Sequence, residues 1–189
     1  MIKIGILGDI GSGKSYVAKS FGYPVFNADV EVSKIYKTSK KCFNKLNKFL
    51  PKYIFSFPVK KKEISNAILA NKSNLKKIVS IVHLEIRKKM NIFLKTNINK
   101  KIIILDIPLL LENKINKKTN ILVFVQSKKK EINKRLKKRE NYNSRLLKRF
   151  KNIQLPLDYK KKKSNFIIKN DFTKKSIKDG IKNILKKVL

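Results

Sequence analysis

The stretch GDIGSGKS at residues 8–15 decides the fold, because it fits the phosphate-binding loop (P-loop) pattern G-x-x-x-x-G-K-[ST] without a mismatch. The preceding residues 2–7 (IKIGIL) form a short apolar run that predicts a buried strand. The following residues 14–21 predict a helix that Gly22 closes. Strand, glycine loop and helix therefore come in the order that phosphate binding needs. This order argues against a glycine-rich turn that merely precedes a lysine.

The residues of this loop have separate expected tasks. Its glycines can adopt backbone angles closed to other residues, so the loop can wrap around a phosphate chain with its N–H groups pointing at anionic oxygens. The Lys14 ammonium is expected to reach the β- and γ-phosphates of ATP, and the Ser15 hydroxyl is expected to ligate Mg²⁺. The predicted ATP-binding residues of this segment are Gly8, Gly11, Ser12, Gly13, Lys14, Ser15 and Tyr16.

The length of the chain and its apolar segments limit the class of protein. A chain of 189 residues is long enough for one sizeable core and too short for two ordinary domains. No apolar run approaches the ~20 residues of a membrane span, and the apolar start runs directly into the loop. We therefore expect no signal peptide, no membrane partner and a cytoplasmic location. A monomer is expected as well, although no sequence feature specifies the oligomeric state. The single cysteine, Cys42, excludes an internal disulfide and is expected to be a small helical residue.

The formal net charge of +36 suggests nucleic-acid binding, because lysine and arginine side chains on a surface bind phosphate backbones. Only five of the 48 basic residues are arginine, however, and the chain is also rich in asparagine and isoleucine. This mixture is typical of an AT-rich genome that fills tolerant surface positions, so no specific nucleic-acid partner is expected. The five arginines are therefore candidates for phosphate contacts, because lysine cannot replace a bidentate phosphate contact.

Further apolar runs predict an α/β protein. Residues 23–27, 102–105, 121–125 and 166–168 predict four more strands. Between residues 30 and 97 the apolar spacing is helical throughout, with a long helix that Ser73 is expected to cap, and a last helix is expected after Thr173. The predicted fold is a P-loop NTPase three-layer sandwich, with a five-stranded parallel sheet, a helical substrate-binding insertion and a helical lid. The predicted boundaries are 1–29, 99–134 and 164–189 for the nucleotide-binding core, 30–98 for the insertion and 135–163 for the basic lid.

Two of the twelve carboxylates follow predicted strands. In open α/β sheets the ligand site lies beyond the carboxyl ends of the strands, so Asp29, after the second strand, is expected to project toward the phosphates. Asp106 ends the apolar run 102–105, which is the Walker B arrangement for holding Mg²⁺. A solvated loop residue is the alternative for Asp29, and a purely structural carboxylate is the alternative for Asp106.

Other candidates are a histidine and a group of arginines. His83 lies beside the apolar stripe of the long helix, which leaves a structural packing role and a catalytic role as alternatives. Arg135 and Arg139 are four residues apart and are predicted to share one helix face, and Arg145 and Arg149 repeat this spacing. In small P-loop kinases a lid at this place supplies cations to the transferred phosphoryl group. A solvated basic face is the alternative.

Taken together, these motifs resemble those of the dephospho-coenzyme A kinases, in family order and over nearly the whole chain. The family's patterns are TGGIGSGKST, PVIDAD, IxHPxVR, PLLFE, RLxxRD and a closing segment Q…K…AD-x-I-x-N. The matching stretches here are ILGDIGSGKS at 6–15, PVFNAD at 24–29, IVHLEIR at 81–87, LDIPLLLEN at 105–113, RLKKRE at 135–140 and IQLPLDYKKKKSNFIIKN at 153–170.

The resemblance implies transfer of the ATP γ-phosphate to the 3′-hydroxyl of the dephospho-coenzyme A ribose, the last step of coenzyme A synthesis. It implies that Asp29 is the general base, with Lys14 and the lid residue Arg139 as further catalytic residues. It also implies that Asn170 lies near the ATP adenine. The implied acceptor-binding residues are Asp29, Lys61, His83 and Arg87.

The chain departs from the family pattern at several positions. Asp9 stands in the loop where the family has glycine, and this sets a carboxylate close to the bound phosphates. Lys61 stands for a family arginine, which weakens a bidentate phosphate contact. The other departures are Tyr16 for threonine, Asn27 for aspartate, Leu84 for proline and Ser164-Asn165 for Ala-Asp.

Two other functions fit the sequence. Another small P-loop kinase, acting on a nucleotide or a small metabolite, would share the loop and the sheet. A basic nucleic-acid-binding protein with incidental ATPase activity is more distant, because the chain lacks paired aromatic stacking motifs and repeated helicase elements.

Overall fold

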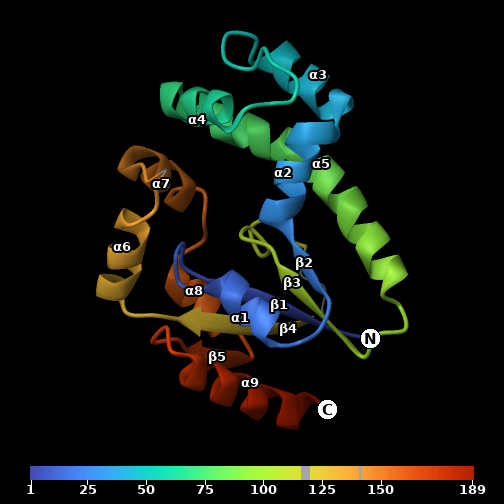
Figure 1. The fold of residues 1–189 in the computed structure, drawn as a ribbon, viewed down its shortest axis with the longest axis vertical. Coiled ribbons are helices and arrows are strands. Elements are labelled where there is room, and N and C mark those ends of the chain that lie inside the picture. The colour runs from blue at the N-terminus through green and yellow to red at the C-terminus, as the bar shows by residue number, and fades with distance from the viewer. Residues whose placement is uncertain (116–119, 141) are drawn as a thin grey trace. The chain divides into compact units, whose positions relative to one another are not determined.

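The computed structural model describes residues 1–115, 120–140 and 142–189. Its five strands form one sheet in the order β2-β3-β1-β4-β5 (Figure 1). Every strand pairing is parallel, as the alternation of apolar runs and helical segments predicts. The strands are β1 (Ile2–Gly8), β2 (Val25–Asn27), β3 (Ile102–Asp106), β4 (Asn120–Gln126) and β5 (Phe166–Lys169). The predicted five-stranded parallel sheet is thus confirmed.

Helices cover one face of the sheet with a continuous apolar core. This core joins α1 (Lys14–Ser20) and α9 (Lys174–Val188) to alternate residues of the strands. The α9 helix begins after Thr173 as predicted, with the Thr173 hydroxyl accepting a hydrogen bond from the Ser176 N–H. The buried members of this core are Ile4, Ile6, Val17, Ala18, Phe21, Ile102, Ile104, Val123, Val125, Ile168, Ile177, Ile181 and Ile184.

The other strand positions pack on a second layer. The short helix α8 (Leu157–Lys162) contacts β1, and the Leu110 side chain lies directly over Gly5. A Cβ atom at Gly5 would meet Leu110 Cδ1 and Leu122 Cδ2 at 3.0 Å, so a glycine is needed for this close packing. With helices or loop side chains on both faces, the sheet is the middle layer of an α/β sandwich.

The chain folds into two compact units, which we describe separately. The sheet unit comprises Met1–Asn27, Asn97–Tyr142 and Gln154–Leu189, and the helical unit comprises Ala28–Thr96 and Asn143–Ile153. The sheet unit also contains α6 (Lys129–Lys137). The helical unit consists of α2 (Ala28–Thr38), α3 (Lys40–Phe49), α4 (Lys61–Ala70), α5 (Lys72–Thr96) and α7 (Ser144–Lys151).

The helical unit has its own small core, and it includes the single cysteine. Cys42 lies on α3 with 2% of its surface exposed, and Ile35 and Leu46 are other buried residues of the unit. Burial, and the nearby negative charge of Glu85, raise the pKa of the Cys42 thiol to about 11. Cys42 is therefore a small buried helical residue, as expected from its sequence context.

Two local predictions were wrong. The long helix α5 starts at Lys72, and the Asn71 side chain caps it, accepting hydrogen bonds from the Ser73 N–H at 2.9 Å and the Ser73 hydroxyl at 3.0 Å. Ser73 is thus inside the helix. Arg139 does not share a helix face with Arg135, because α6 ends at Lys137 and tight turns follow. In these turns the Arg139 N–H bonds to Leu136 and the Tyr142 N–H bonds to Arg139.

No helix within the described ranges combines the length and the apolar character that a membrane span requires.

Candidate active site

The glycine loop leaves β1 and enters α1 through left-handed backbone angles. Gly11 and Gly13 have φ angles of +86° and +91°, which side chains rarely permit. Gly13 is the N-cap residue of α1, and no side chain bonds to the helix start there. An anion bound at this helix start would meet the N-terminal end of α1 and its positive dipole.

The loop is also fixed from behind, through the carbonyl oxygen of Ser12. The Ser127 hydroxyl donates to this oxygen at 3.0 Å, and the Asn170 side-chain amide donates to it at 2.8 Å. The structure therefore brings Asn170 to the loop. Ser12 itself is fully buried, with 0% of its surface exposed.

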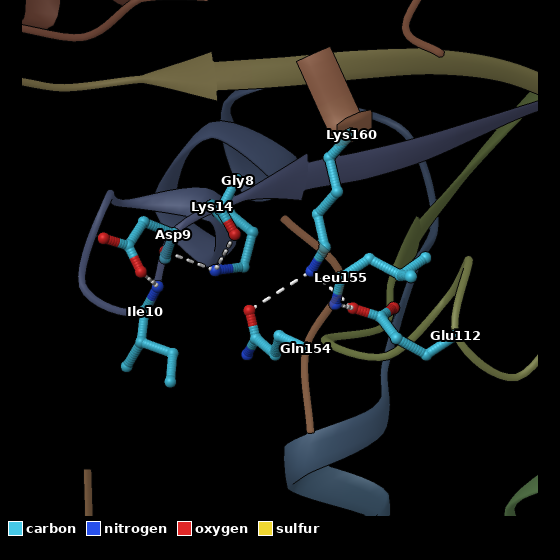
Figure 2. A network of polar contacts seen from close by, with 8 residues as sticks. All are labelled: Gly8, Asp9, Ile10, Lys14, Glu112, Gln154, Leu155 and Lys160. Atoms are coloured by element: carbon cyan, nitrogen blue, oxygen red, sulfur yellow. Dashed lines mark hydrogen bonds and ion pairs between the residues drawn. The ribbon is translucent and has the colours of Figure 1, made fainter. Parts of the chain in front are cut away.

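Lys14 folds back over the loop that carries it (Figure 2). Its ammonium donates to the carbonyl of Asp9 at 2.7 Å and to the carbonyl of Gly8 at 3.3 Å. Each of these carbonyls is neutral, so a phosphate oxygen would be a stronger partner for the ammonium. The arrangement keeps the cation at the loop and lets it exchange partners when an anion arrives.

The structure gives a local account of Asp9, the departure inside the loop. One carboxylate oxygen, Oδ1, accepts a hydrogen bond from the Ile10 N–H at 2.7 Å (Figure 2). Asparagine and aspartate commonly bond to nearby backbone N–H groups in turns. Asp9 therefore stabilises the bend at the start of the loop.

Asp106 lies at the carboxyl end of β3 and is 2% exposed. Its Oδ2 accepts a hydrogen bond of 2.6 Å from the Asn27 side-chain amide, and these two residues are also partners in the β2–β3 register. Because β3 lies beside β1, Asp106 shares the sheet edge from which the loop departs. Ser15 stands exposed in the first turn of α1. A hydroxyl and a carboxylate provide the oxygen donors that Mg²⁺ uses together with substrate phosphates, so these residues fit the ion.

The predicted acceptor residues belong to the helical unit. Asp29 is the second residue of α2, and Lys61 is the first residue of α4, both exposed. His83 and Arg87 lie one turn apart on α5. Burial and the positive charge of Arg87 lower the pKa of His83, which favours the neutral imidazole. The structure thus brings His83 and Arg87 together on one helix face.

The arginines divide between the two units. In the sheet unit, the Arg135 guanidinium lies 4.4 Å from the centroid of the Phe172 ring, a cation–π contact. Arg139 is exposed beyond the end of α6. In the helical unit, Arg149 donates to the Leu69 carbonyl at 3.4 Å, which ties α7 to α4, whereas Arg145 is exposed.

Sequence reasoning missed a buried ion pair in the sheet unit. The Lys160 ammonium lies 2.7 Å from Glu112 Oε1, and only 1% of the lysine side chain is exposed (Figure 2). Lys160 also donates to the Gln154 side chain at 3.2 Å, and Glu112 accepts from the Leu155 N–H at 2.9 Å. The stretches that carry these residues contributed to the family resemblance, but no property of Lys160 marks it within the run 160–163 (KKKK).

Comparison with known proteins decides the family. The family model described as dephospho-CoA kinase matches residues 2–176. The chain belongs to the dephospho-CoA kinase family. A dephospho-CoA kinase of Wolbachia from Brugia malayi is 32% identical over 187 residues, which cover 96% of this chain and 95% of that protein.

Solved structures show the same fold. The protein TT1252 from Thermus thermophilus has a TM-score of 0.78 at 23% identity, covering 100% of this chain and 98% of that one. A dephospho-CoA kinase from Campylobacter jejuni has a TM-score of 0.61 at 20% identity, with 98% and 96% covered. The α/β fold of a P-loop kinase is therefore shown, together with membership in this ATP-dependent kinase family.

Proposed function

We propose that this protein transfers the γ-phosphate of ATP to the 3′-hydroxyl of the dephospho-coenzyme A ribose, giving coenzyme A and ADP. The observation that carries the proposal is the family match over residues 2–176. The chain also keeps the loop that the reaction needs, with its glycines in left-handed conformations and the Lys14 ammonium at its surface. The monomeric state and the cytoplasmic location stay predictions.

In the proposed mechanism, Asp29 accepts the proton of the attacking ribose hydroxyl. Its exposed position at the start of α2, directly after β2, leaves the carboxylate accessible to a substrate. Lys14 and the loop N–H groups hold the β- and γ-phosphates in line with the acceptor. Arg139, exposed beyond α6, is proposed to neutralise the charge that develops on the transferred group.

Ser15 and Asp106 are proposed to hold Mg²⁺. The ion, when bound, would supply positive charge to the β- and γ-phosphate oxygens. The bond from Asn27 to Asp106 orients the carboxylate, because it occupies one oxygen and leaves the other for the ion or its water.

The acceptor is proposed to contact Lys61, His83 and Arg87. Arg87 offers the planar fork that suits a phosphate, and the neutral His83 offers a hydrogen bond rather than a charge. The segments 30–98 and 135–163 are proposed to act as the acceptor-binding insertion and the lid, respectively. ATP is proposed to bind through the loop, with Tyr16 following Ser15 on α1 and Asn170 behind the loop.

The deciding experiment incubates the purified protein with Mg-ATP and dephospho-coenzyme A, and follows ADP release and product mass. AMP and RNA serve as parallel acceptors. A product one phosphate heavier, formed only from dephospho-coenzyme A, is expected. Transfer to AMP instead would favour a nucleotide kinase. RNA-stimulated hydrolysis that falls steeply with salt would favour a nucleic-acid-dependent ATPase.

The assignment of the base is tested with Asp29→Asn. This variant is expected to lower turnover by a factor on the order of 10²–10⁴ while ATP binding stays nearly unchanged. Glu31→Gln is the matched control, because Glu31 is a carboxylate on the same helix that pairs with Lys34 at 2.7 Å. Full activity of the Asp29 variant would remove this residue as the base.

A further inference from the structure

Two side chains donate hydrogen bonds to one backbone carbonyl oxygen of the phosphate loop, that of Ser12. Ser127 follows the end of β4 and Asn170 follows the end of β5, and these strands are neighbours in the sheet. Both donate to the Ser12 carbonyl oxygen, at 3.0 Å and 2.8 Å. We propose that Ser127 and Asn170 are positioning residues that orient the Ser12–Gly13 peptide, so that the Gly13 N–H faces the phosphates of the bound nucleotide. The identity of the nucleotide as ATP rests on the proposed function.

The amide of Asn170 is fixed in its orientation. Its Oδ1 accepts a hydrogen bond from the Phe172 N–H at 2.8 Å, so its NH₂ group must face the Ser12 carbonyl. The backbone is anchored as well, because the Asn170 N–H donates to the Gln126 carbonyl at 2.8 Å. Asn170 is 3% exposed, so water does not compete for these bonds.

Because the peptide bond is planar, fixing the Ser12 carbonyl also fixes the direction of the Gly13 N–H. In a planar trans peptide the C=O and the N–H point in opposite directions. Holding the Ser12 oxygen toward the strand ends therefore turns the Gly13 N–H away from them. Gly13 is the N-cap of α1, so this N–H belongs to the group of amides that meets an anion at the helix start.

The glycine at position 13 makes this contact possible. A Cβ atom there would lie only 2.5 Å from the Asn170 side-chain nitrogen. The left-handed φ of +91° also disfavours a side chain at this position. Gly13 thus leaves room for the Asn170 side chain on one side of the loop, and it lets the backbone approach the phosphates on the other.

Nucleotide binding separates this role from a direct contact to the adenine. Asn170→Asp keeps an acceptor for Phe172 but sets a carboxylate oxygen against the Ser12 carbonyl, so two acceptors face each other. We expect the Kd of ATP to rise about tenfold or more, and the Kd of inorganic tripolyphosphate to rise by the same factor. Ser127→Ala should raise both constants about threefold, because one donor remains.

Asn165→Ala is the matched control. Asn165 is another asparagine next to β5, directly before the strand, and its Oδ1 accepts from the Leu122 N–H at 2.8 Å, away from the loop. This variant should lower the melting temperature but leave both Kd values unchanged. A loss confined to ATP, with tripolyphosphate binding intact, would assign Asn170 to the adenine and overturn the proposal.

Further outcomes keep the test decisive. If Asn170→Asp does not fold, Asn170→Ala and Ser127→Ala carry the test, and unchanged tripolyphosphate binding in both would overturn the proposal. Binding is measured without an acceptor, so a failure to phosphorylate dephospho-coenzyme A would affect the proposed function and leave this inference standing.

Discussion

Lys14 and Lys160 are two lysines of the same sheet unit in opposite environments. Lys14 is half-buried and donates to the neutral carbonyls of Asp9 and Gly8, whereas Lys160 is 1% exposed and pairs with the Glu112 carboxylate. A phosphate can replace carbonyl partners at a surface loop at little cost. A buried ammonium cannot lose its carboxylate, because the uncompensated charge would remain in the interior. The comparison is consistent with the proposed phosphate-binding role of Lys14 and predicts that Lys160 contributes mainly to stability.

Removing Lys14 should give the largest effect, and it should fall on activity. Lys14→Met is expected to lower turnover on the order of 10²-fold or more, because the loop loses the cation proposed to meet the transferred phosphate. Its melting temperature should fall less than that of Lys160→Met, because Lys14 is only half-buried and donates to loop carbonyls rather than to a buried carboxylate. Steady-state kinetics and thermal unfolding measure the two quantities. Unchanged ATP affinity and turnover would contradict the assigned role.

Removing Lys160 should shift the effect to stability. Lys160→Met leaves Glu112, whose side chain is only 10% exposed, without its cationic partner. The free energy of unfolding is expected to fall by about 3–5 kcal/mol. At roughly 2–4 °C per kcal/mol for a chain of this size, the melting temperature should drop by about 10 °C. Lys161→Met, on the same helix but only half-buried, is the control. Equal shifts in the two variants would contradict a special role for the buried pair.

The two regions also differ in how far the sequence predicts them. The loop and the strands can be predicted from the sequence because short stretches of neighbouring residues determine them. Glycines stand where the backbone needs left-handed angles, and β-branched runs form the strands that are buried on both faces. Asp106 was predictable as a site candidate because it ends such a run. These features need only neighbouring residues to define them.

The features that the sequence did not reveal depend on contacts between distant segments. Glu112 and Lys160 meet only after the sheet has formed, and the run 160–163 offers four lysines with nothing to choose between them. The hydrogen bonds from Ser127 and Asn170 to the Ser12 carbonyl likewise join three separate segments of the chain. The error at Ser73 is instead local, because Asn71 is an equally good capping residue two positions earlier.

A double variant removes both charges of the buried pair. Glu112→Gln with Lys160→Met should recover most of the stability that Lys160→Met alone loses, because no uncompensated charge stays buried. The glutamine oxygen can still accept from the Leu155 N–H. Chemical denaturation of the parent, both single variants and the double variant gives the coupling energy. A double variant that is as unstable as the sum of the single variants would show that the two side chains act independently.

The smallest effect is expected from an exposed carboxylate, which tests whether burial is what separates the two lysines. Asp171 accepts hydrogen bonds from Ser176 and Thr173 at the start of α9, and these bonds lower its pKa from 3.8 to about 2. A lowered pKa in the folded state adds stability that is fully present above pH 4 and is lost as the pH falls toward 2.

Asp171→Asn should therefore reduce the loss of melting temperature between pH 4 and pH 2, with Asp179→Asn on the same helix as the control. Because solvent screens a fully exposed group, the shift should be far smaller than that of Lys160→Met. A shift as large as that of Lys160→Met would mean that local hydrogen bonding, rather than burial, sets the energetic weight of a charge in this protein.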